Sequence, residues 1–340
     1  MREHRTRSAL FAAVPLLAAA AAAIAPVSAA AARSEPTGLT PSFTSNGVLS
    51  SVAAVSASDA WAVGATASGQ TLIVHWNGTA WARVPSPTPA GGGSLEGVAA
   101  TSARNAWAVG QASRGGKTLI LRWNGSAWKR VPSPTPAASG GVLDSVAAAS
   151  ADSAWAVGTT LTGGTAVGLI ERWNGIAWKL VPSPASEGLS GVAATSARRA
   201  WAVGFGLRAK TLILRWNGTA WKRVPGLTPG RAALTGVAAT SARNAWAVGG
   251  TGTNPSTLAM RWNGAAWKRL PSPTPAGGAP FLAVGASSSG NAWAVGSTSN
   301  FKTFIERWNG RAWKRVPSPT PAGGAILDGV AAASPAAPGQ

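Results

Sequence analysis

The sequence predicts an all-β protein, a β-propeller whose four-stranded blades are each about 46 residues long. Three short words recur six times along the 340 residues: Ala-Trp-Ala-Val-Gly, Trp-Asn-Gly, and an Ala-Trp pair that follows each Trp-Asn-Gly. A repeat of this length is typical of propellers and solenoids, and no segment has the apolar period of a helix. We expect six blades, and the alternative is an incomplete ring of seven.

All 18 tryptophans fall within these repeated words. An aromatic residue that returns at the same place in every copy most economically fills the interface between two blades. We therefore assign the tryptophans to the core and not to a platform that stacks on sugars. They form three columns: Trp61, Trp107, Trp155, Trp201, Trp246 and Trp293; Trp76, Trp123, Trp173, Trp216, Trp262 and Trp308; and Trp81, Trp128, Trp178, Trp221, Trp267 and Trp313.

Each unit divides into four strand-like pieces, which residues 94–133 illustrate. The inner strand reads Ser-Leu-Glu-Gly-Val-Ala-Ala-Thr-Ser, and the second reads Asn-Ala-Trp-Ala-Val-Gly. The third, Lys-Thr-Leu-Ile-Leu-Arg-Trp, is rich in residues that favour strands. The fourth, Ala-Trp-Lys-Arg-Val-Pro-Ser, would form the outer edge of the blade, where Lys and Pro block pairing with other sheets.

Asn-Gly joins the third and fourth strands and is the strongest short hairpin signal, because both central residues of a type I′ turn need positive φ. A two-residue turn at Asn124 and Gly125 pairs Leu121 with Trp128. We also expect Arg130 to stack on Trp128 or on a ring of the adjacent blade. One face of the hairpin then carries Leu119, Leu121, Trp123, Trp128 and Arg130.

The order of these words resembles a kelch unit: Gly-Val-Ala-Ala-Thr-Ser, Ala-Trp-Ala-Val-Gly, Leu-Ile-Leu-Arg-Trp-Asn-Gly, then Trp-Lys-Arg-Val-Pro-Ser-Pro-Thr-Pro. The resemblance, to kelch-type propellers and the central domain of galactose-oxidase-like proteins, covers about residues 48–334. In most copies the second strand ends in one glycine where the family has two, and the third strand lacks the usual tyrosine. The resemblance therefore implies a fold and no functional subfamily.

We divide the chain into a secretory signal peptide over 1–30, a linker over 31–47, the propeller over 48–334 and a tail over 335–340. An extra inner strand, which reads Ile-Leu-Asp-Gly-Val-Ala-Ala-Ala-Ser, follows the sixth repeat and is expected to pair where the ring closes. The repeats and this strand are 48–93, 94–141, 142–188, 189–233, 234–280, 281–325 and 326–334.

The first residues indicate export. A basic start precedes an alanine-rich apolar run, and Val-Ser-Ala at 27–29 offers small residues for cleavage. We expect a secreted protein, with a membrane anchor formed by an uncleaved signal as the alternative. After removal of the signal, we expect no transmembrane segment. The Ala, Gly and Arg bias is typical of a GC-rich bacterial gene.

The charge balance is strongly basic. After removal of the signal, 27 basic and nine acidic side chains remain, a net charge of +18. Such a protein attracts anionic polymers, although duplication of one unit multiplied much of this charge. The chain carries no specific nucleic-acid motif. Three repeated columns hold Arg122, Arg172, Arg215, Arg261 and Arg307; Lys129, Lys179, Lys222, Lys268 and Lys314; and Arg83, Arg130, Arg223, Arg269 and Arg315.

The residue inventory argues against an enzyme. The copper-radical chemistry that the galactose oxidase resemblance would imply needs tyrosine and cysteine, and the chain contains neither. The mature chain has one histidine, His75, where other copies have arginine. A carboxylate pair for glycoside hydrolysis is conceivable, but no pair stands out in the sequence. We expect no catalytic residue, no cofactor and no metal. The acids considered are Asp59, Glu96, Asp144, Asp152, Glu171, Glu187, Glu306 and Asp328.

Binding residues are expected in the loops between the second and third strands, which vary in length and chemistry while the rest of the unit is copied. These loops would surround one mouth of the central channel. Sequence drift, which loop tips tolerate without any role in binding, explains the variation among these loops equally well. The polar candidates are Gln70, Arg114, Lys117, Arg208, Lys210, Asn254, Asn300 and Lys302.

These observations favour an exported, non-enzymatic binding scaffold, a monomer whose partner is an anionic cell-envelope polymer, a glycan or a protein. A carbohydrate-active enzyme on a propeller scaffold and a purely structural repeat protein are the alternatives.

Overall fold

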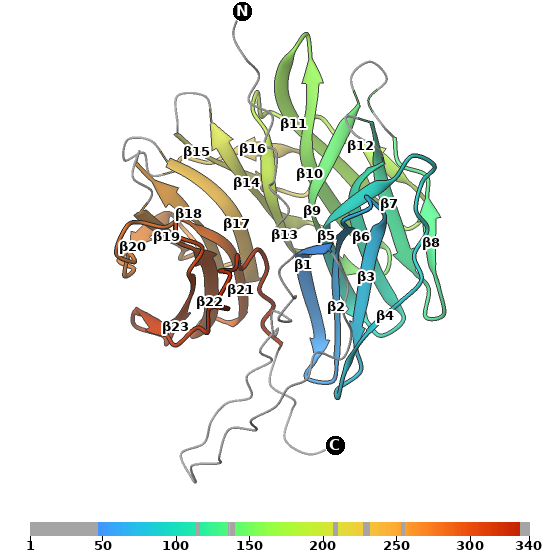
Figure 1. Ribbon diagram of the computed structural model, residues 1–340. Helices are drawn as coiled ribbons and strands as arrows, with labels where there is room; N and C mark the ends of the chain where they lie inside the picture. The colour runs from blue at the N-terminus through green and yellow to red at the C-terminus, as the bar shows by residue number, and fades with distance from the viewer. Residues whose placement is uncertain are drawn as a thin grey trace, which may run out of the picture.

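The computed structural model describes residues 47–112, 116–134, 136, 140–206, 210–226, 232–252 and 256–333. Six four-stranded antiparallel sheets stand in a ring as the blades of a β-propeller (Figure 1), which confirms the predicted fold. Helices are absent from these ranges, so none of the described residues forms a helix that could cross a membrane. The predicted signal peptide, the tail and most of the linker lie outside the described residues.

The four strands of each blade follow one another in sequence from the inside of the ring to the outside. Blades 1 to 3 contain β1 (Gly47–Ser56), β2 (Asp59–Thr66), β3 (Thr71–Trp76), β4 (Trp81–Arg83); β5 (Gly93–Ser102), β6 (Asn105–Ala112), β7 (Lys117–Trp123), β8 (Trp128–Val131); and β9 (Gly141–Ser150), β10 (Ser153–Thr162), β11 (Thr165–Trp173), β12 (Trp178–Leu180). Blades 4 to 6 contain β13 (Leu189–Ser196), β14 (Arg199–Gly206), β15 (Lys210–Trp216), β16 (Trp221–Arg223); β17 (Ala232–Ser241), β18 (Asn244–Thr251), β19 (Ser256–Trp262), β20 (Trp267–Leu270); and β21 (Phe281–Ser288), β22 (Asn291–Ser297), β23 (Thr303–Trp308), β24 (Trp313–Val316).

A bulge interrupts each inner strand at the same place. In β5 it leaves Glu96 without a partner on β6, because Leu95 pairs with Gly110 while Gly97 pairs with Val109. The bulge brings the backbone of the inner strand against the glycine of Ala-Trp-Ala-Val-Gly, and a Cβ at Gly110 would lie 2.0 Å from the carbonyl oxygen of Ser94. Only glycine fits this close approach, which explains its return in every blade.

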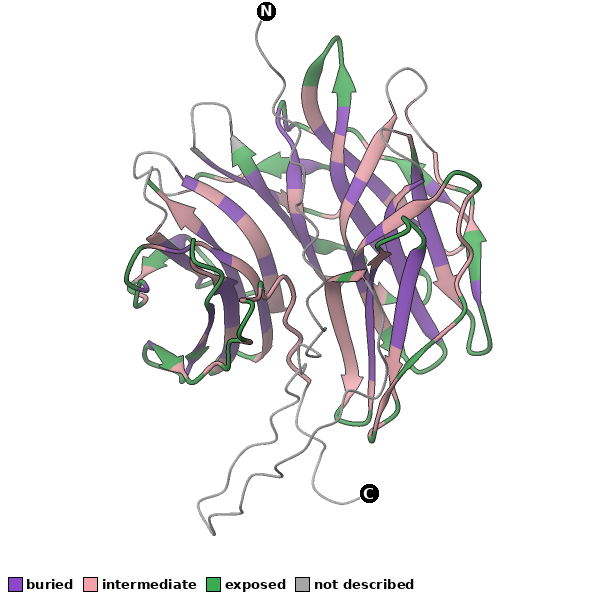
Figure 2. Ribbon diagram, in the orientation of Figure 1, coloured by how far each residue is buried: buried purple, intermediate pink, exposed green. Residues whose placement is uncertain are grey.

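The tryptophans fill the interfaces between blades, as predicted. Trp107 in β6 is fully buried and packs against Trp173 and Trp178 of blade 3, with ring centres 4.9 and 5.1 Å apart. These separations and tilts are favourable for aromatic pairs. Figure 2 shows the buried residues concentrated along the strands inside the blades. The same triad joins blades 1 and 2, 3 and 4, 4 and 5, and 5 and 6.

The predicted register of the hairpin between the third and fourth strands is wrong by two residues. Trp123 pairs with Trp128, and Leu121 pairs with Arg130. Because side chains alternate between faces with a period of two, an even shift leaves every side chain on the face that was predicted for it. The assignment of faces therefore survives the error in register.

The turn of this hairpin has four residues and is closed by a side chain. Asn124 accepts hydrogen bonds at its Oδ1 from the backbone N–H groups of Ser126 and Ala127, at 3.0 and 2.9 Å. Gly125 has a φ of 97°, whereas no asparagine in the described ranges has positive φ. The same two hydrogen bonds to asparagine recur in the other five blades. The Asn-Gly word is thus explained by an asparagine-capped turn and not by a type I′ turn.

The arginine that stacks on tryptophan is Arg122 of the third strand and not Arg130 of the fourth. The guanidinium carbon of Arg122 lies 4.9 Å from the centre of the Trp107 ring and 5.4 Å from that of Trp173. Arg122 pairs with Trp107 in the sheet, so both side chains share the face that meets blade 3. Arg130 lies on the opposite face of the outermost strand and is exposed.

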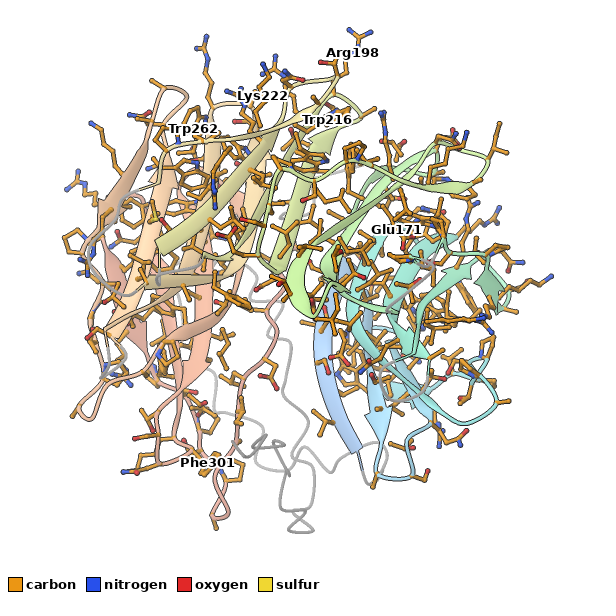
Figure 3. All side chains as sticks on the ribbon, turned by 90° about the horizontal axis from the view of Figure 1, so that it is seen from above. Glu171, Arg198, Trp216, Lys222, Trp262 and Phe301 are labelled. Atoms are coloured by element: carbon orange, nitrogen blue, oxygen red, sulfur yellow. The ribbon has the colours of Figure 1, made fainter. Side chains whose placement is uncertain are left out.

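One further segment lies between blade 6 and blade 1, where the sequence predicts an extra inner strand. A Cβ at Gly285 in β21 would lie 2.9 Å from the carbonyl oxygen of Val330, and a Cβ at Gly329 would lie 3.2 Å from the backbone nitrogen of Val52 in β1. Residues 326–333 therefore occupy the position of an inner strand, between two others (Figures 1 and 3). In contrast to the six inner strands, this segment joins none of the sheets that the described residues form.

Candidate functional site on the outer wall

The outer wall of the ring consists of the short fourth strands and the linkers that lead from them to the next inner strand. The word Lys-Arg in the fourth strands places cations on both faces of these strands, and all of them are exposed to solvent. The exposed cations of the fourth strands are Arg83, Lys129, Arg130, Lys179, Lys222, Arg223, Lys268, Arg269, Lys314 and Arg315.

A group of hydroxyls ties the Pro-Ser-Pro-Thr linkers of blades 1, 5 and 6 to the third strand of the same blade. In blade 5, Thr257 at the start of β19 shares hydrogen bonds with the hydroxyls of Ser272 and Thr274, at 2.8 and 2.9 Å. The N–H of Thr257 also donates to the Thr274 hydroxyl at 3.3 Å. Blades 1 and 6 repeat the group with Thr71, Ser86, Thr88, Thr303, Ser318 and Thr320.

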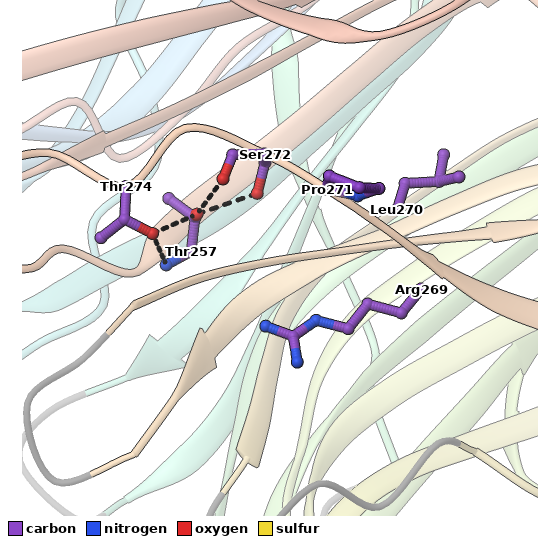
Figure 4. A pocket seen from close by; sticks show the side chains of 6 residues that line it. All are labelled: Thr257, Arg269, Leu270, Pro271, Ser272 and Thr274. Carbon is purple, nitrogen blue, oxygen red and sulfur yellow. Dashed lines mark hydrogen bonds between the residues drawn. The ribbon is translucent and has the colours of Figure 1, made fainter.

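These hydroxyls line a recess in blade 5 of about 370 Å³. Its other walls are Arg269, Leu270 and Pro271. Figure 4 shows the guanidinium end of Arg269 turned towards the side of the recess where Thr257 lies. A guanidinium beside several hydroxyls supplies hydrogen-bond donors and a positive charge, which is the donor set that a phosphate, sulfate or carboxylate group requires.

Blade 1 carries the same recess, with a volume of about 410 Å³. It is lined by Arg83, Ser86 and Thr88 at the positions that Arg269, Ser272 and Thr274 hold in blade 5, together with Thr71 and Gln70. Sequence reasoning missed this site because it interpreted Pro-Ser-Pro only as protection of the sheet edge. The threonine that begins the third strand, together with the serine between the two prolines, was the available signal.

Blades 3 and 4 depart from this pattern. Blade 3 has Leu180 in place of the arginine and Gly168 in place of the threonine. In blade 4, Arg223 forms an ion pair with the buried Glu187 at 3.0 Å, and Gly226 replaces the serine of the linker. The recess is therefore not an obligatory consequence of the fold.

Most of the carboxylates are buried or half-buried, whereas the cations of the fourth strands are exposed. Among the acids that the structure describes, Asp152 alone is exposed. In blade 1, Oδ1 of Asp59 lies 2.8 Å from Nε2 of His75. This contact takes the place of the hydrogen bond that Arg122 donates to Asn105 in blade 2. The surface is consequently more positive than the net charge alone would indicate.

Three of the acids that look scattered in the sequence share one structural column. Glu96, Asp144 and Asp328 each follow the leucine of an inner segment, in β5, β9 and 326–333. Burial, together with the charge of Glu96, raises the pKa of Asp144 to about 7 and raises the pKa of Asp328. The words Leu-Glu-Gly, Leu-Asp-Ser and Leu-Asp-Gly were the sequence signal for this column.

Two further acids are fully buried between blades. Both oxygens of Glu171 accept from the Ser133 hydroxyl of the preceding blade, at 3.1 and 3.0 Å, and Figure 3 marks Glu171 within its blade. Burial raises the pKa of Glu171 to about 8, and it raises the pKa of Glu306 to about 7 against the opposing effect of Arg315. Within the described ranges, no group of three or more His, Cys, Asp or Glu side chains could hold a metal ion.

The loop residues predicted to bind a partner are placed only in part. Gln70, Lys117, Asn300 and Lys302 are exposed, and Gln70 lines the blade 1 recess. Phe301, which the prediction passed over, is 55% exposed and has a φ of 56°, an unusual backbone conformation for a bulky residue. The other predicted residues lie outside the described residues or have undescribed side chains: Arg114, Arg208, Asn254 and Lys210.

No protein-family model matches the sequence, and a search of curated proteins finds no match. Solved structures do resemble the fold. YCF48 bound to a D1 peptide is 16% identical with a TM-score of 0.54, over 80% of this chain and 81% of that one. The Aleuria aurantia lectin in complex with Fucα1-6GlcNAc is 14% identical with a TM-score of 0.56, over 82% and 98%. The GH74 xyloglucanase from Xanthomonas campestris is 15% identical with a TM-score of 0.58, over 83% of this chain and 47% of the enzyme. At these identities the chain shares with them the β-propeller fold.

Proposed function

We propose that this protein is an exported, non-enzymatic scaffold that binds an anionic polymer of the cell envelope along the outer wall of its propeller. The observation that carries the proposal is the pair of equivalent recesses in blades 1 and 5, each with one arginine and three hydroxyls. The resemblance of the sequence to kelch-type propellers belongs to this proposal, because such a ring offers a rigid frame for repeated sites.

The distribution of charge supports an anionic ligand. The fourth strands present exposed cations, while every described acid except Asp152 is buried or half-buried, and the buried Glu187 is paired with Arg223. Counterions released from a polyanion on such a surface favour association. Two equivalent sites on one rigid ring also raise the avidity for a polymer above the affinity of either single site.

The chemistry of the recess supports specificity beyond bulk charge. Arginine binds phosphate and carboxylate groups with two parallel hydrogen bonds, which lysine cannot do. The Ser272 hydroxyl donates to Thr257, whereas the Thr274 hydroxyl can accept from Thr257 and donate to the same anion or to a sugar hydroxyl. The recess is therefore suited to a polymer that alternates anionic groups and hydroxyls.

A second candidate is a protein or glycan bound by the loops between the second and third strands. Phe301 favours it, because an exposed aromatic side chain in a left-handed conformation lies between Asn300 and Lys302. The predicted loop residues remain the proposed contacts for this ligand.

The test compares three double variants that each remove two positive charges. Arg83→Gln with Arg269→Gln changes the recesses, Arg104→Gln with Arg243→Gln changes exposed arginines before the second strands, and Lys117→Gln with Lys302→Gln changes the loop face. Binding to polyphosphate, to a sulfated glycan and to neutral dextran is measured across a salt series.

We expect the recess variant to weaken polyanion binding by about tenfold or more and to lower the salt slope by about two. The other two pairs should cost much less. Equal losses in all three pairs would reduce the proposal to bulk charge attraction, and a loss confined to the loop pair would favour the second candidate. Turnover of any tested glycan would contradict the non-enzymatic part.

A further inference from the structure

The recesses of blades 1 and 5 have similar linings, but the following blade presents a different residue to each of them. After blade 5 this residue is Glu306 in β23, and after blade 1 it is Leu121 in β7. Each precedes the word Arg-Trp-Asn-Gly, which fixes their equivalence. Both side chains are fully buried. A carboxyl group therefore stands at one interface where an apolar side chain stands at the other.

The side chain of Glu306 points towards blade 5. Glu306 and Trp308 are two residues apart in β23, so they lie on the same face of the strand. Trp308 packs against Trp246 of blade 5, with ring centres 5.0 Å apart. Ala294, which is opposite Glu306 in β22, packs in the same interface. The carboxyl group of Glu306 is thus held between blades 5 and 6.

The interface between blades 2 and 3 shows what a glutamate at this position reaches. Glu171 in β11 is the equivalent of Glu306, and Ser133 is the equivalent of Ser272 in the Pro-Ser-Pro linker of the preceding blade. The Ser133 hydroxyl donates to both oxygens of Glu171, at 3.1 and 3.0 Å. A glutamate here is therefore within reach of the linker serine. By this equivalence Glu306 lies next to Ser272, which lines the blade 5 recess.

In blade 5 the linker serine is bonded elsewhere. The Ser272 hydroxyl donates to Thr257 at 2.8 Å. Both oxygens of Glu306 are buried, and neither has a hydrogen-bond partner among the described residues. Burial disfavours an ionised carboxylate far more than a neutral carboxyl, so it raises the pKa of Glu306 to about 7 against the opposing effect of Arg315. Glu306 therefore changes its charge near neutral pH, beside a residue of the recess.

The other charged groups at this interface are cations that keep their charge. Arg315 lies opposite Glu306 in β24, and its guanidinium carbon lies 5.5 Å from the centre of the Phe304 ring. From blade 5, Arg261 and Lys268 share the face that meets blade 6. Arginine and lysine stay protonated up to about pH 10. Among the described groups that face this interface, Glu306 alone therefore changes its charge around neutral pH.

We propose that Glu306 is a specificity-determining residue of the blade 5 recess, which binds an anionic group such as a sulfate ester or a phosphodiester while Glu306 is neutral and releases it once Glu306 is ionised. The blade 1 recess, which has Leu121 at this position, binds the same group in both conditions. An ionised Glu306 repels the anion in a poorly solvated site, and it draws the Ser272 hydroxyl towards itself, as Glu171 does with Ser133. This inference rests on the proposed function.

The test uses the intact protein and a short sulfated dextran, because sulfate esters stay ionised throughout the pH range. Arg83→Gln removes the arginine of the blade 1 recess and leaves blade 5 to bind, and Arg269→Gln does the reverse. Affinity is measured at constant ionic strength from about pH 5.5 to about pH 8.5. In Arg83→Gln we expect it to fall about fivefold or more as pH rises through 7, because Glu306 becomes negative. In Arg269→Gln it should change much less.

Two variants in the Arg83→Gln background isolate the role of Glu306. Glu306→Gln keeps a side chain of similar shape that cannot ionise, so the affinity should stay near its low-pH value across the whole range. Glu306→Leu copies the residue of blade 2 and should do the same, which covers the case in which the glutamine variant does not fold. Asp144→Asn is the matched control. It removes another acid whose pKa is raised to about 7, in inner strand β9, and should leave the fall in affinity unchanged.

The outcomes separate this inference from the proposed function. A fall that persists in the Glu306 variants would overturn the inference, as would an equal fall in Arg83→Gln and Arg269→Gln or a constant affinity in Arg83→Gln. Each of these results would leave the proposed function standing, provided that binding still depends on the two arginines. Binding that both arginine replacements leave unaltered at every pH would refute the proposed function, and this inference with it.

Discussion

The guanidinium carbon of Arg307 lies 5.1 Å from the centre of the Trp293 ring. Both residues belong to blade 6, the last blade of the propeller. Among the described residues, no tryptophan pair of a following blade packs against them. In blades 2 to 5 the equivalent arginine lies over two rings, one from its own blade and one from the next. The repeat thus builds this interface five times, and at Trp293 the described residues supply only the first half of it. The stability of the propeller should therefore be unequal around the ring.

The first prediction compares two tryptophans of one column. Trp107→Ala should lower the free energy of unfolding by about 3–5 kcal/mol, because it opens a cavity at a fully buried site. Trp293→Ala, at the half-buried equivalent position, should cost clearly less. Urea unfolding followed by fluorescence measures both. Equal losses would contradict the view that the end of the ring is only half covered.

The second prediction concerns the arginine between the rings. Arg122→Ala should cost about 1–2 kcal/mol, because it removes a cation–π contact, the packing of a half-buried side chain and the hydrogen bond to Asn105. Lys129→Ala, in the adjacent strand but exposed, should change stability by less than about 0.5 kcal/mol. If the two variants lose the same amount in thermal unfolding, Arg122 has no role in joining blades 2 and 3.

The third prediction follows from the buried Glu171. Its pKa is raised from 4.5 to about 8, so between these values the native chain holds a proton that the unfolded chain has released. The free energy of unfolding should therefore fall as pH rises through this window, by at most about 1.4 kcal/mol per pH unit. The contribution is complete below pH 4.5 and lost above about pH 8.

The variant Glu171→Gln checks this directly, since it keeps a neutral acceptor for the Ser133 hydroxyl and cannot titrate. Its stability should vary less with pH between 5 and 8 than that of the natural chain. The matched control is Asp152→Asn, which changes an exposed acid and should leave the pH profile unaltered. An unchanged profile in Glu171→Gln would show that the native carboxyl is ionised throughout.

The repeat itself made the fold predictable from the sequence. Six copies of three words fixed the period, the strand count and the burial of the tryptophans, because any position that is copied six times must satisfy the same packing six times. The hairpin register was less predictable. Asn124 closes a four-residue turn through its side chain, a geometry that the Asn-Gly word alone does not distinguish from a type I′ turn.

The candidate site was harder to predict for a different reason. Arg269, Ser272 and Thr257 lie on separate pieces of one blade and converge only when the linker folds back over the third strand. Duplication also makes candidate binding residues look structural, since both kinds recur in several copies. The acids Glu96 and Asp144 remained hidden because their shared column crosses from one blade to the next.

The last prediction concerns this acid column. Burial and the charge of Glu96 raise the pKa of Asp144 from 3.8 to about 7, so ionising Asp144 in the native ring is unfavourable. Asp144→Asn removes that cost. Relative to the natural chain, the variant should gain stability as pH rises from about 4 to 7 and should hold that gain above pH 7. Glu96→Gln should lower the pKa of Asp144, as measured by NMR titration of its side-chain carboxyl carbon. A pKa of Asp144 that does not respond to Glu96→Gln would mean that burial alone raises it, and the two carboxylates would then not act as a coupled pair.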